Sequence, residues 1–337
     1  MRIRITGAER MDKSMKLGVL TVPLQGMPAE EAFAYLHSLG VQAVELGTGG
    51  YTNDNHLKPS VYLADDGKIE EMKALLKKYD LEISALSCHG NPVHPNKETA
   101  AAYHQVYVDT CRLAEKLGVE TVVTFSGCPG DCETSQRPNW VTCSWPPEYA
   151  ETLDWQWNQV LIPYWKEAVK VAQSHGVKKI AFEMHPGFCV YNPATLLRIR
   201  AAVGDIIGAN FDPSHLIWQG MDPVAALREL KGAVHHFHFH AKDTKVDPYN
   251  KAKNGVLDTG SYGDLLDRSW VFRTIGYGTD ANLWKDMMST LRMIGHEGAV
   301  SIEHEDGLMS VKQGLEKAVA FLKEVMITEQ PAAMWWA

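Results

Sequence analysis

The chain has 337 residues, of which 41 are acidic and 33 basic, so its formal net charge is −8. Hydrophobic residues make up 45% and charged residues 22%, which is the balance of a soluble globular protein and excludes a disordered chain. Only six cysteines and 27 glycines exclude a disulfide scaffold and a collagen-like repeat. The acidic balance argues against a nucleic-acid partner, because phosphate binding requires a clustered basic surface.

No segment is apolar enough to predict a signal peptide or a membrane span. Residues 1–16 carry positive charge, but the apolar run at 17–24 is short and interrupted by Pro23. No window approaches the ~20 apolar residues that a membrane helix needs. We therefore expect a cytoplasmic protein with no membrane partner. Its cysteines are expected to be reduced thiols, since they lack the CxxC…CxxC spacing of a structural zinc site.

Short β-rich runs alternate with longer amphipathic stretches along the chain. The predicted strands are 17–22, 41–46, 83–87, 121–125, 180–184, 206–211, 234–240 and 299–304. The predicted helices between them include 30–39, 69–79, 99–117, 161–175, 224–230, 283–294 and 311–325. Eight such units predict an α/β fold, a single (β/α)8 TIM barrel. An open doubly wound sheet is the alternative, but no GxGxxG follows the first strand.

Two long connections interrupt this rhythm, after strand 4 (126–151) and after strand 7 (241–280). In a barrel, both extended loops lie at the C-terminal face, where active sites are built. Residues 1–15 and 328–337 fall outside the pattern. We expect an N-terminal extension (1–15), a barrel (16–327) and a C-terminal tail (328–337) that is either disordered or docked on another subunit.

Polar residues that bind metals or transfer protons follow four consecutive predicted strands. Because side chains alternate in facing along a strand, one parity points into the barrel mouth, and we take Glu183, Asp212, His240 and Glu303 as inward. Three carboxylates and one imidazole suit Mn²⁺, Mg²⁺, Co²⁺ or Zn²⁺. His238 shares the facing of His240 and is the alternative ligand. Asp212 precedes a proline and is also a candidate helix N-cap.

The four strand ends read FEMHPG, NFDPSH, HFHAKD and SIEHED, in this order. Together they resemble the sugar phosphate isomerase/epimerase family of xylose isomerase-like barrels. The resemblance implies a metal ion, Mn²⁺ as first expectation, held by Glu183, Asp212, His240 and Glu303. It implies that Glu183 and Glu303 also form the catalytic acid/base pair, and that substrate oxygens contact His185 and His215. It also suggests a homo-oligomer.

The expected reaction follows from this chemistry. A divalent cation bound by adjacent hydroxyl and carbonyl oxygens stabilises the enediolate that forms when the neighbouring carbon loses a proton. One carboxylate removes this proton, and its partner returns it. Return to the opposite face gives epimerisation, and return to the next carbon gives isomerisation. We therefore expect an isomerase or epimerase that acts on a small carbohydrate, with or without phosphate.

Three alternatives remain. The first is a lyase of the same family, either a sugar dehydratase or the catalytic subunit of a C-glycoside deglycosidase, which would need a small partner subunit. The second is a metal-dependent endonuclease of the related barrel family, against which the net charge of −8 counts. The third is a non-enzymatic sugar-binding barrel. Such a protein is expected to lack one or more of the four metal ligands, whereas all four are present here.

Each of the further substrate-binding candidates also has a purely structural interpretation. His89 follows strand 3 and could bind substrate or fix its loop. Lys242 follows the ligand histidine and could bind a substrate oxygen or pair with Asp243. Arg273 could clamp an anionic group or fix its loop. Trp140, in the loop after strand 4, could cover a sugar face or form an oligomer contact. The run from Glu45 to Gly50 is interpreted as a flexible turn at the barrel mouth.

Overall fold

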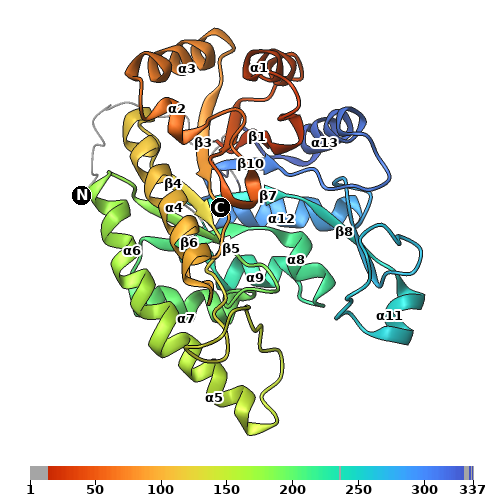
Figure 1. Cartoon of the computed structure of the whole chain (residues 1–337). Helices are drawn as coiled ribbons and strands as arrows, with labels where there is room; N and C mark the ends of the chain where they lie inside the picture. The colour runs from red at the N-terminus through yellow and green to blue at the C-terminus, as the bar shows by residue number, and fades with distance from the viewer. Residues whose placement is uncertain (1–13, 235–236, 330–333, 335, 337) are drawn as a thin grey trace.

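The computed structural model describes residues 14–234, 237–329, 334 and 336 (Figure 1). Eight parallel strands of the described chain form a closed barrel, in the order β1-β10-β7-β6-β5-β4-β3-β2. The barrel strands are β1 (Lys16–Leu20), β2 (Ala43–Gly47), β3 (Glu82–Ser87), β4 (Thr121–Thr124), β5 (Lys179–Glu183), β6 (Ile207–Phe211), β7 (His238–Ala241) and β10 (Ala299–Ile302). The predicted (β/α)8 barrel is confirmed.

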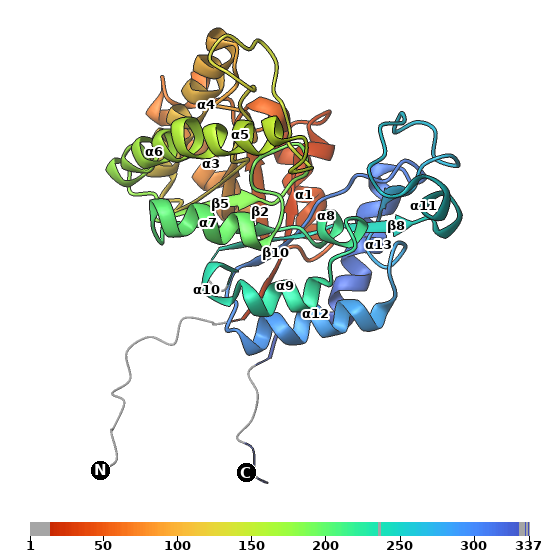
Figure 2. The same cartoon turned by 90° about the horizontal axis from the view of Figure 1, so that it is seen from below.

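Helices surround this barrel (Figure 1 and Figure 2). They are α1 (Ala29–Ser38), α2 (Pro59–Tyr62), α3 (Asp66–Lys78), α4 (Lys97–Leu117), α5 (Pro147–Trp155), α6 (Ile162–Ser174), α7 (Pro193–Val203), α8 (Pro213–Trp218), α9 (Pro223–Glu229), α10 (Lys231–Val234), α11 (Pro248–Asn254), α12 (Ala281–Met293) and α13 (Val311–Val325). Short 3₁₀ turns η1 (Val22–Leu24) and η2 (Gly50–Thr52) follow β1 and β2, and a π-helical turn η3 (Gln156–Leu161) joins α5 to α6. No helix within the described residues is long and apolar enough to cross a membrane.

Two of the predicted elements have clearly different bounds in the structure. The predicted strand 234–240 is shorter, because α10 ends at Val234 and β7 begins at His238, while residues 235 and 236 lie outside the described part. The helix after strand 4 starts at Pro147 rather than at residue 161, with η3 inside it. The extension 1–15 and the tail 328–337 lie largely outside the described residues, so these boundaries stay predictions.

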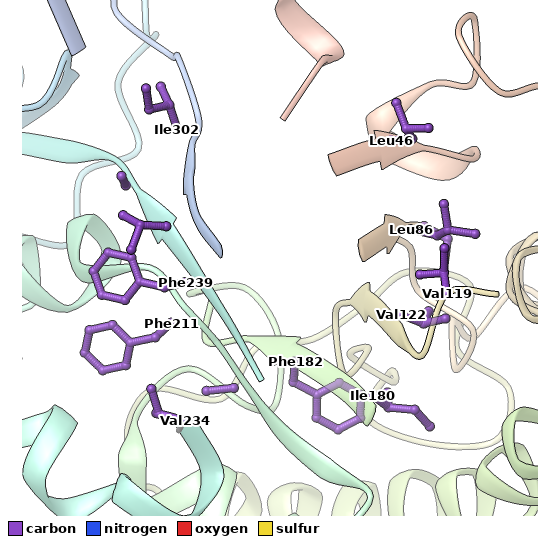
Figure 3. Packing of buried hydrophobic residues seen from close by; sticks show 14 of the residues in the cluster. Leu46, Leu86, Val119, Val122, Ile180, Phe182, Phe211, Val234, Phe239 and Ile302 are labelled. Atoms are coloured by element: carbon purple, nitrogen blue, oxygen red, sulfur yellow. The ribbon is translucent and has the colours of Figure 1, made fainter. Parts of the chain in front are cut away.

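Side chains of the barrel strands alternate between two buried layers. Large apolar residues such as Phe182, Phe211 and Phe239 are fully buried and form one cluster with the apolar faces of the helices (Figure 3). The opposite parity faces the barrel axis. There a separate small cluster contains Ala85, Val123 and Ala181, together with Phe237, which precedes β7 and packs against Gly208. Apolar residues therefore fill the lower barrel, and polar residues occupy the layers toward the C-terminal ends of the strands.

The long connection after β7 has a structure of its own. Strands β8 (Asp243–Val246) and β9 (Trp270–Arg273) pair antiparallel, and α11 lies between them at the outer edge of the molecule (Figure 1 and Figure 2). The buried carboxylate of Asp243 holds this insertion to the barrel. It accepts hydrogen bonds from the backbone amides of Thr244, Gly276, Gly278 and Thr279 and from Trp284 Nε1.

Replacing Asp243 with alanine should lower the free energy of unfolding by about 3 kcal/mol, because the substitution leaves several buried donors without an acceptor. Urea denaturation followed by circular dichroism measures this loss. Asp264→Ala, at an exposed carboxylate of the same insertion, is the control and should change stability by no more than about 0.5 kcal/mol. Equal stability of the two variants would contradict the anchoring role.

Candidate metal centre

Four side chains from consecutive barrel positions meet at the C-terminal ends of the strands. Glu183 ends β5, Asp212 follows β6, His240 lies in β7 and Glu303 follows β10. One ligand atom from each lies within 4.8 Å of those of the other three. Glu183, Asp212 and His240 are buried, and the side chain of Glu303 is 14% exposed. The structure therefore brings together the four residues taken as inward-facing from strand parity.

His240 is at the middle of this cluster. Its Nδ1 lies 2.9 Å from Glu303 Oε2 and 3.3 Å from Glu183 Oε2. Two further histidines contact the other side of Glu183: His89 Nε2 lies 3.0 Å from Oε2, and His215 Nε2 lies 3.1 Å from Oε1. Burial alone would raise the pKa of Glu183, but these imidazoles outweigh it and hold the pKa well below its usual value.

Lys242 supplies a buried positive charge beside the carboxylates. Its Nζ lies 3.0 Å from Asp212 Oδ2, 2.9 Å from Glu303 Oε2 and 3.2 Å from Glu305 Oε2. Burial would lower the pKa of Lys242, but these acidic neighbours outweigh it and raise the pKa well above its usual value. The alternative pairing with Asp243 does not occur, because that carboxylate accepts bonds from the insertion instead.

Asp212 serves two structural purposes at once. Its Oδ1 accepts a hydrogen bond from the backbone amide of Ser214 at 2.8 Å and so caps the N-terminus of α8. Its Oδ2 faces Lys242 Nζ and lies 3.4 Å from His215 Nε2. Asp212 therefore caps α8 with one carboxylate oxygen and joins the acidic cluster with the other.

His238 lies two residues earlier on β7, one layer deeper in the barrel. Its Nδ1 is 3.0 Å from Asn210 Oδ1, and its Nε2 is 3.2 Å from Ser84 Oγ. These contacts occupy both ring nitrogens of His238. His240, by contrast, directs Nδ1 toward Glu183 and Glu303.

Glu45 supports the cluster from below and was missed by the sequence interpretation, which placed it in a flexible turn. It is fully buried in β2, and its Oε2 lies 2.9 Å from His240 Nε2. Ser87 Oγ and Ser301 Oγ also donate hydrogen bonds to this carboxylate. Burial would raise the pKa of Glu45, but the neighbouring histidines outweigh it and keep the pKa well below its usual value. The available signal was a lone carboxylate inside the apolar run AVEL.

The cluster fits a divalent cation. His240 Nδ1 and Asp212 Oδ2 are buried, and neither has a partner of good hydrogen-bond geometry among the described residues. Three carboxylates outnumber the single Lys242 ammonium, so the cluster keeps a surplus of negative charge. Oxygen and imidazole donors without thiolate suit Mn²⁺, Mg²⁺, Co²⁺ or Zn²⁺.

A cavity of about 330 Å³ opens above the cluster. Glu183, Glu303, Lys242, His89 and His185 line it, with an apolar wall that includes Leu20, Val22 and Phe125. Burial, together with the nearby His215, lowers the pKa of His185 to about 3, so this imidazole is neutral at pH 7. The cavity has the size and mixed lining of a site for a small polar ligand.

Three of the substrate-binding candidates, His215, Arg273 and Trp140, do not line this cavity. Arg273 is in β9, where its Nε donates to Asp306 Oδ2 at 3.1 Å, and it does not line the cavity. Trp140 contacts Tyr191 edge-on and lines an adjoining hollow that also reaches His185 and His215.

Comparison with known proteins agrees with this architecture. A Bacillus subtilis (strain 168) protein, "Uncharacterized protein YfiH", is 40% identical over 314 residues, which cover 93% of this chain and 99% of that protein. The structure of 3-keto-D-glucoside 4-epimerase, YcjR, from E. coli matches with a TM-score of 0.62 at 14% identity, covering 92% and 99% of the two chains. The probable 3-DHS dehydratase AsbF from Bacillus anthracis matches with a TM-score of 0.60 at 16% identity and the same coverage.

At these identities the two solved structures show a shared fold alone. The family model described as "Xylose isomerase-like TIM barrel" matches residues 33–325, which is most of the chain and includes all four residues of the cluster. The resemblance drawn from the four strand ends is thereby confirmed. The chain belongs to the xylose isomerase-like TIM barrel family.

Proposed function

We propose that this protein is a divalent-metal-dependent enzyme that isomerises or epimerises a sugar or sugar phosphate by proton transfer beside a carbonyl group. The observation that carries the proposal is the pair of carboxylates on the cavity floor. Glu183 and Glu303 both lie next to His240 Nδ1, and both line the cavity. Two carboxylates at one bound ligand provide a proton acceptor and a proton donor.

The metal would be held by Glu183, Asp212, His240 and Glu303, with Mn²⁺ as first expectation and Mg²⁺, Co²⁺ or Zn²⁺ as alternatives. When bound, the cation supplies positive charge that stabilises an anionic oxygen next to the reacting carbon. Lys242 holds Asp212 and Glu303 close together through its two ion pairs.

Glu303 is the better-placed of the two carboxylates to remove the proton, because its side chain is 14% exposed and that of Glu183 only 3%. Burial opposes ionisation of Glu303, but Lys242 and His240 outweigh burial and lower its pKa to about 2. Glu303 is therefore a carboxylate at neutral pH and can accept a proton.

His185 would recognise a substrate hydroxyl. Its Nδ1 lies 2.5 Å from the carbonyl oxygen of Pro186, which can only accept a hydrogen bond, so Nδ1 carries the proton of the neutral ring. Nε2 of His185 is then an acceptor directed to a ligand hydroxyl. His89, which also lines the cavity, directs Nε2 to Glu183 and keeps that carboxylate in place.

A lyase is the second candidate, because the hollow lined by Trp140 adjoins the reaction cavity at His185 and provides room for a leaving substituent. Loss of a β-substituent after the same proton removal would make the protein a sugar dehydratase or a C-glycoside deglycosidase subunit with a small partner.

We further infer a cytoplasmic location, in keeping with six cysteines that form no disulfide.

Proton exchange in D₂O tests the proposed function. Metal-loaded protein is incubated with ketoses, 3-keto-glycosides and a C-glucoside, and the products are followed by NMR. Deuterium at a carbon beside the carbonyl, together with a new epimer or isomer, supports the isomerase or epimerase. Release of an aglycone or of water supports the lyase. Absence of exchange with every sugar, at full metal loading, rejects the isomerase or epimerase and leaves a lyase that needs its partner subunit or a sugar-binding role.

Replacing Glu303 with glutamine should reduce deuterium incorporation by about 10²–10⁴-fold, because the amide cannot accept the proton. Metal content, measured by elemental analysis, separates loss of the base from loss of the ion. Glu324→Gln, at an exposed glutamate of α13, is the control and should retain full activity. Normal turnover of metal-loaded Glu303→Gln would falsify the assigned role.

Replacing Glu45 with glutamine should weaken Mn²⁺ binding by about 10–100-fold, because Glu45 orients the His240 ring through Nε2 and raises the basicity of Nδ1. Titration calorimetry measures the affinity directly. Glu82→Gln, at an exposed glutamate of β3, serves as the control and should bind Mn²⁺ normally. Unchanged affinity of Glu45→Gln would show that Glu45 does not act through His240.

A further inference from the structure

An aromatic hollow adjoins the cavity of the candidate metal centre. It consists of two spaces of about 430 and 220 Å³ that share His185, Tyr262 and Phe272. We call it the aromatic annexe and define it by Trp140, Trp218, Tyr262, Trp270 and Phe272. Its border with the reaction cavity is formed by His185 and Glu305, which line both. A ligand seated over the acidic cluster would therefore meet the annexe directly.

The aromatic rings of the annexe are held in place by the insertion after β7. Trp218 stacks on Trp270 with ring centroids 4.4 Å apart and planes 7° apart. The buried guanidinium of Arg268 lies 4.2 Å from the Tyr262 ring and 4.7 Å from the Trp270 ring. Arg268 Nε also donates to the carbonyl oxygen of Trp270. The annexe is thus preformed, so a ligand would not need to order these rings on binding.

Large apolar side chains are exposed at the annexe. Leu257 and Tyr262 both line it, and they are 63% and 60% exposed. Apolar surface gathered at a concave site beside a reaction cavity is typical of a ligand-binding groove. Flat aromatic faces bind flat partners, which include the C–H face of a sugar ring and the face of a phenol.

Two unpartnered donors indicate what this ligand carries. Trp140 Nε1 and Trp218 Nε1 are buried, and neither has a hydrogen-bond partner within the described part of the chain. Both indoles line the same space of the annexe. A buried N–H without an acceptor is unfavourable, so a ligand with oxygen acceptors would be preferred over a hydrocarbon.

From these observations we infer that the annexe is a subsite for a second, oxygen-bearing ring, and that the substrate is a keto-glycoside, which supplies the carbonyl group that the proposed proton transfer needs, rather than a free monosaccharide. The inference rests on the proposed function for the position of the reacting sugar, which occupies the cavity above Glu183 and Glu303. The second ring, either another sugar or a phenolic aglycone, stacks on Tyr262 and Phe272. Its oxygens accept hydrogen bonds from the two indoles.

Binding measurements test this subsite without requiring turnover. Titration calorimetry and saturation-transfer NMR compare methyl β-D-glucoside with cellobiose, which carries a second sugar ring, and with 4-hydroxyphenyl β-D-glucoside, which carries a phenol. At least one of the two-ring ligands should bind about ten-fold more tightly than the methyl glucoside, with saturation transferred to the second ring. The ligand that shows this gain identifies the kind of ring.

Two variants with matched controls test which residues produce the higher affinity for two-ring ligands. Tyr262→Ala should abolish most of it, whereas Tyr249→Ala, at a 73% exposed tyrosine of the same insertion, should leave it unchanged. Trp140→Phe keeps an aromatic ring but removes the N–H, and it should reduce the gain by about five-fold. Trp145→Phe, at a 74% exposed tryptophan in the same loop, should have no effect.

Equal affinities for one-ring and two-ring ligands, or a gain that survives both Tyr262→Ala and Trp140→Phe, would overturn the subsite. Failure of the proposed function has a different signature, namely a two-ring preference that depends on Tyr262 without deuterium exchange in any sugar. Exchange in free ketoses without a two-ring preference would leave the proposed function intact and reject the subsite.

Discussion

Several carboxylates are buried inside one end of the closed barrel, and the structure depends on their neutralisation by neighbouring residues. An isolated buried carboxylate is strongly destabilising, so each one needs a positive or hydrogen-bonding partner. Lys242 pairs with Asp212 and Glu303, and His240 lies between Glu303 and Glu45. The interior of the barrel is therefore a network in which a change at one residue leaves a buried charge on another. Both the chemistry and the stability of this end of the barrel follow from it.

Much of this arrangement was accessible from the sequence, because a parallel strand alternates with a fixed period and its C-terminal end faces the barrel mouth. Asp212 and Glu303 could be assigned to the mouth on that basis. Glu45 could not, because its partner His240 is 195 residues away and only the closed barrel brings them together. The helix α7 was not predicted, since its sequence PATLLRIRAAV shows no clear alternation of apolar and polar faces.

The insertion after β7 was expected only as a long loop, and local sequence offered little more. Its hairpin β8–β9 depends on Asp243, which accepts bonds from residues up to 41 positions away. Arg273 was expected either to clamp an anionic group or to fix its loop, and in the structure it pairs with Asp306, which follows another strand. Long-range partners of this kind decide whether a charged side chain binds a ligand or fixes a loop, and no local pattern reveals them.

The short helix α8 connects the two halves of the proposed binding site. Its first turn is held by Asp212 Oδ1, while its body presents His215 to Glu183 and Trp218 to the annexe. The Asp212 carboxylate therefore fixes the start of a six-residue helix that carries side chains of both sites. The acidic cluster and the aromatic wall thus share one structural support, and a substitution that removes the Asp212 cap would act on both.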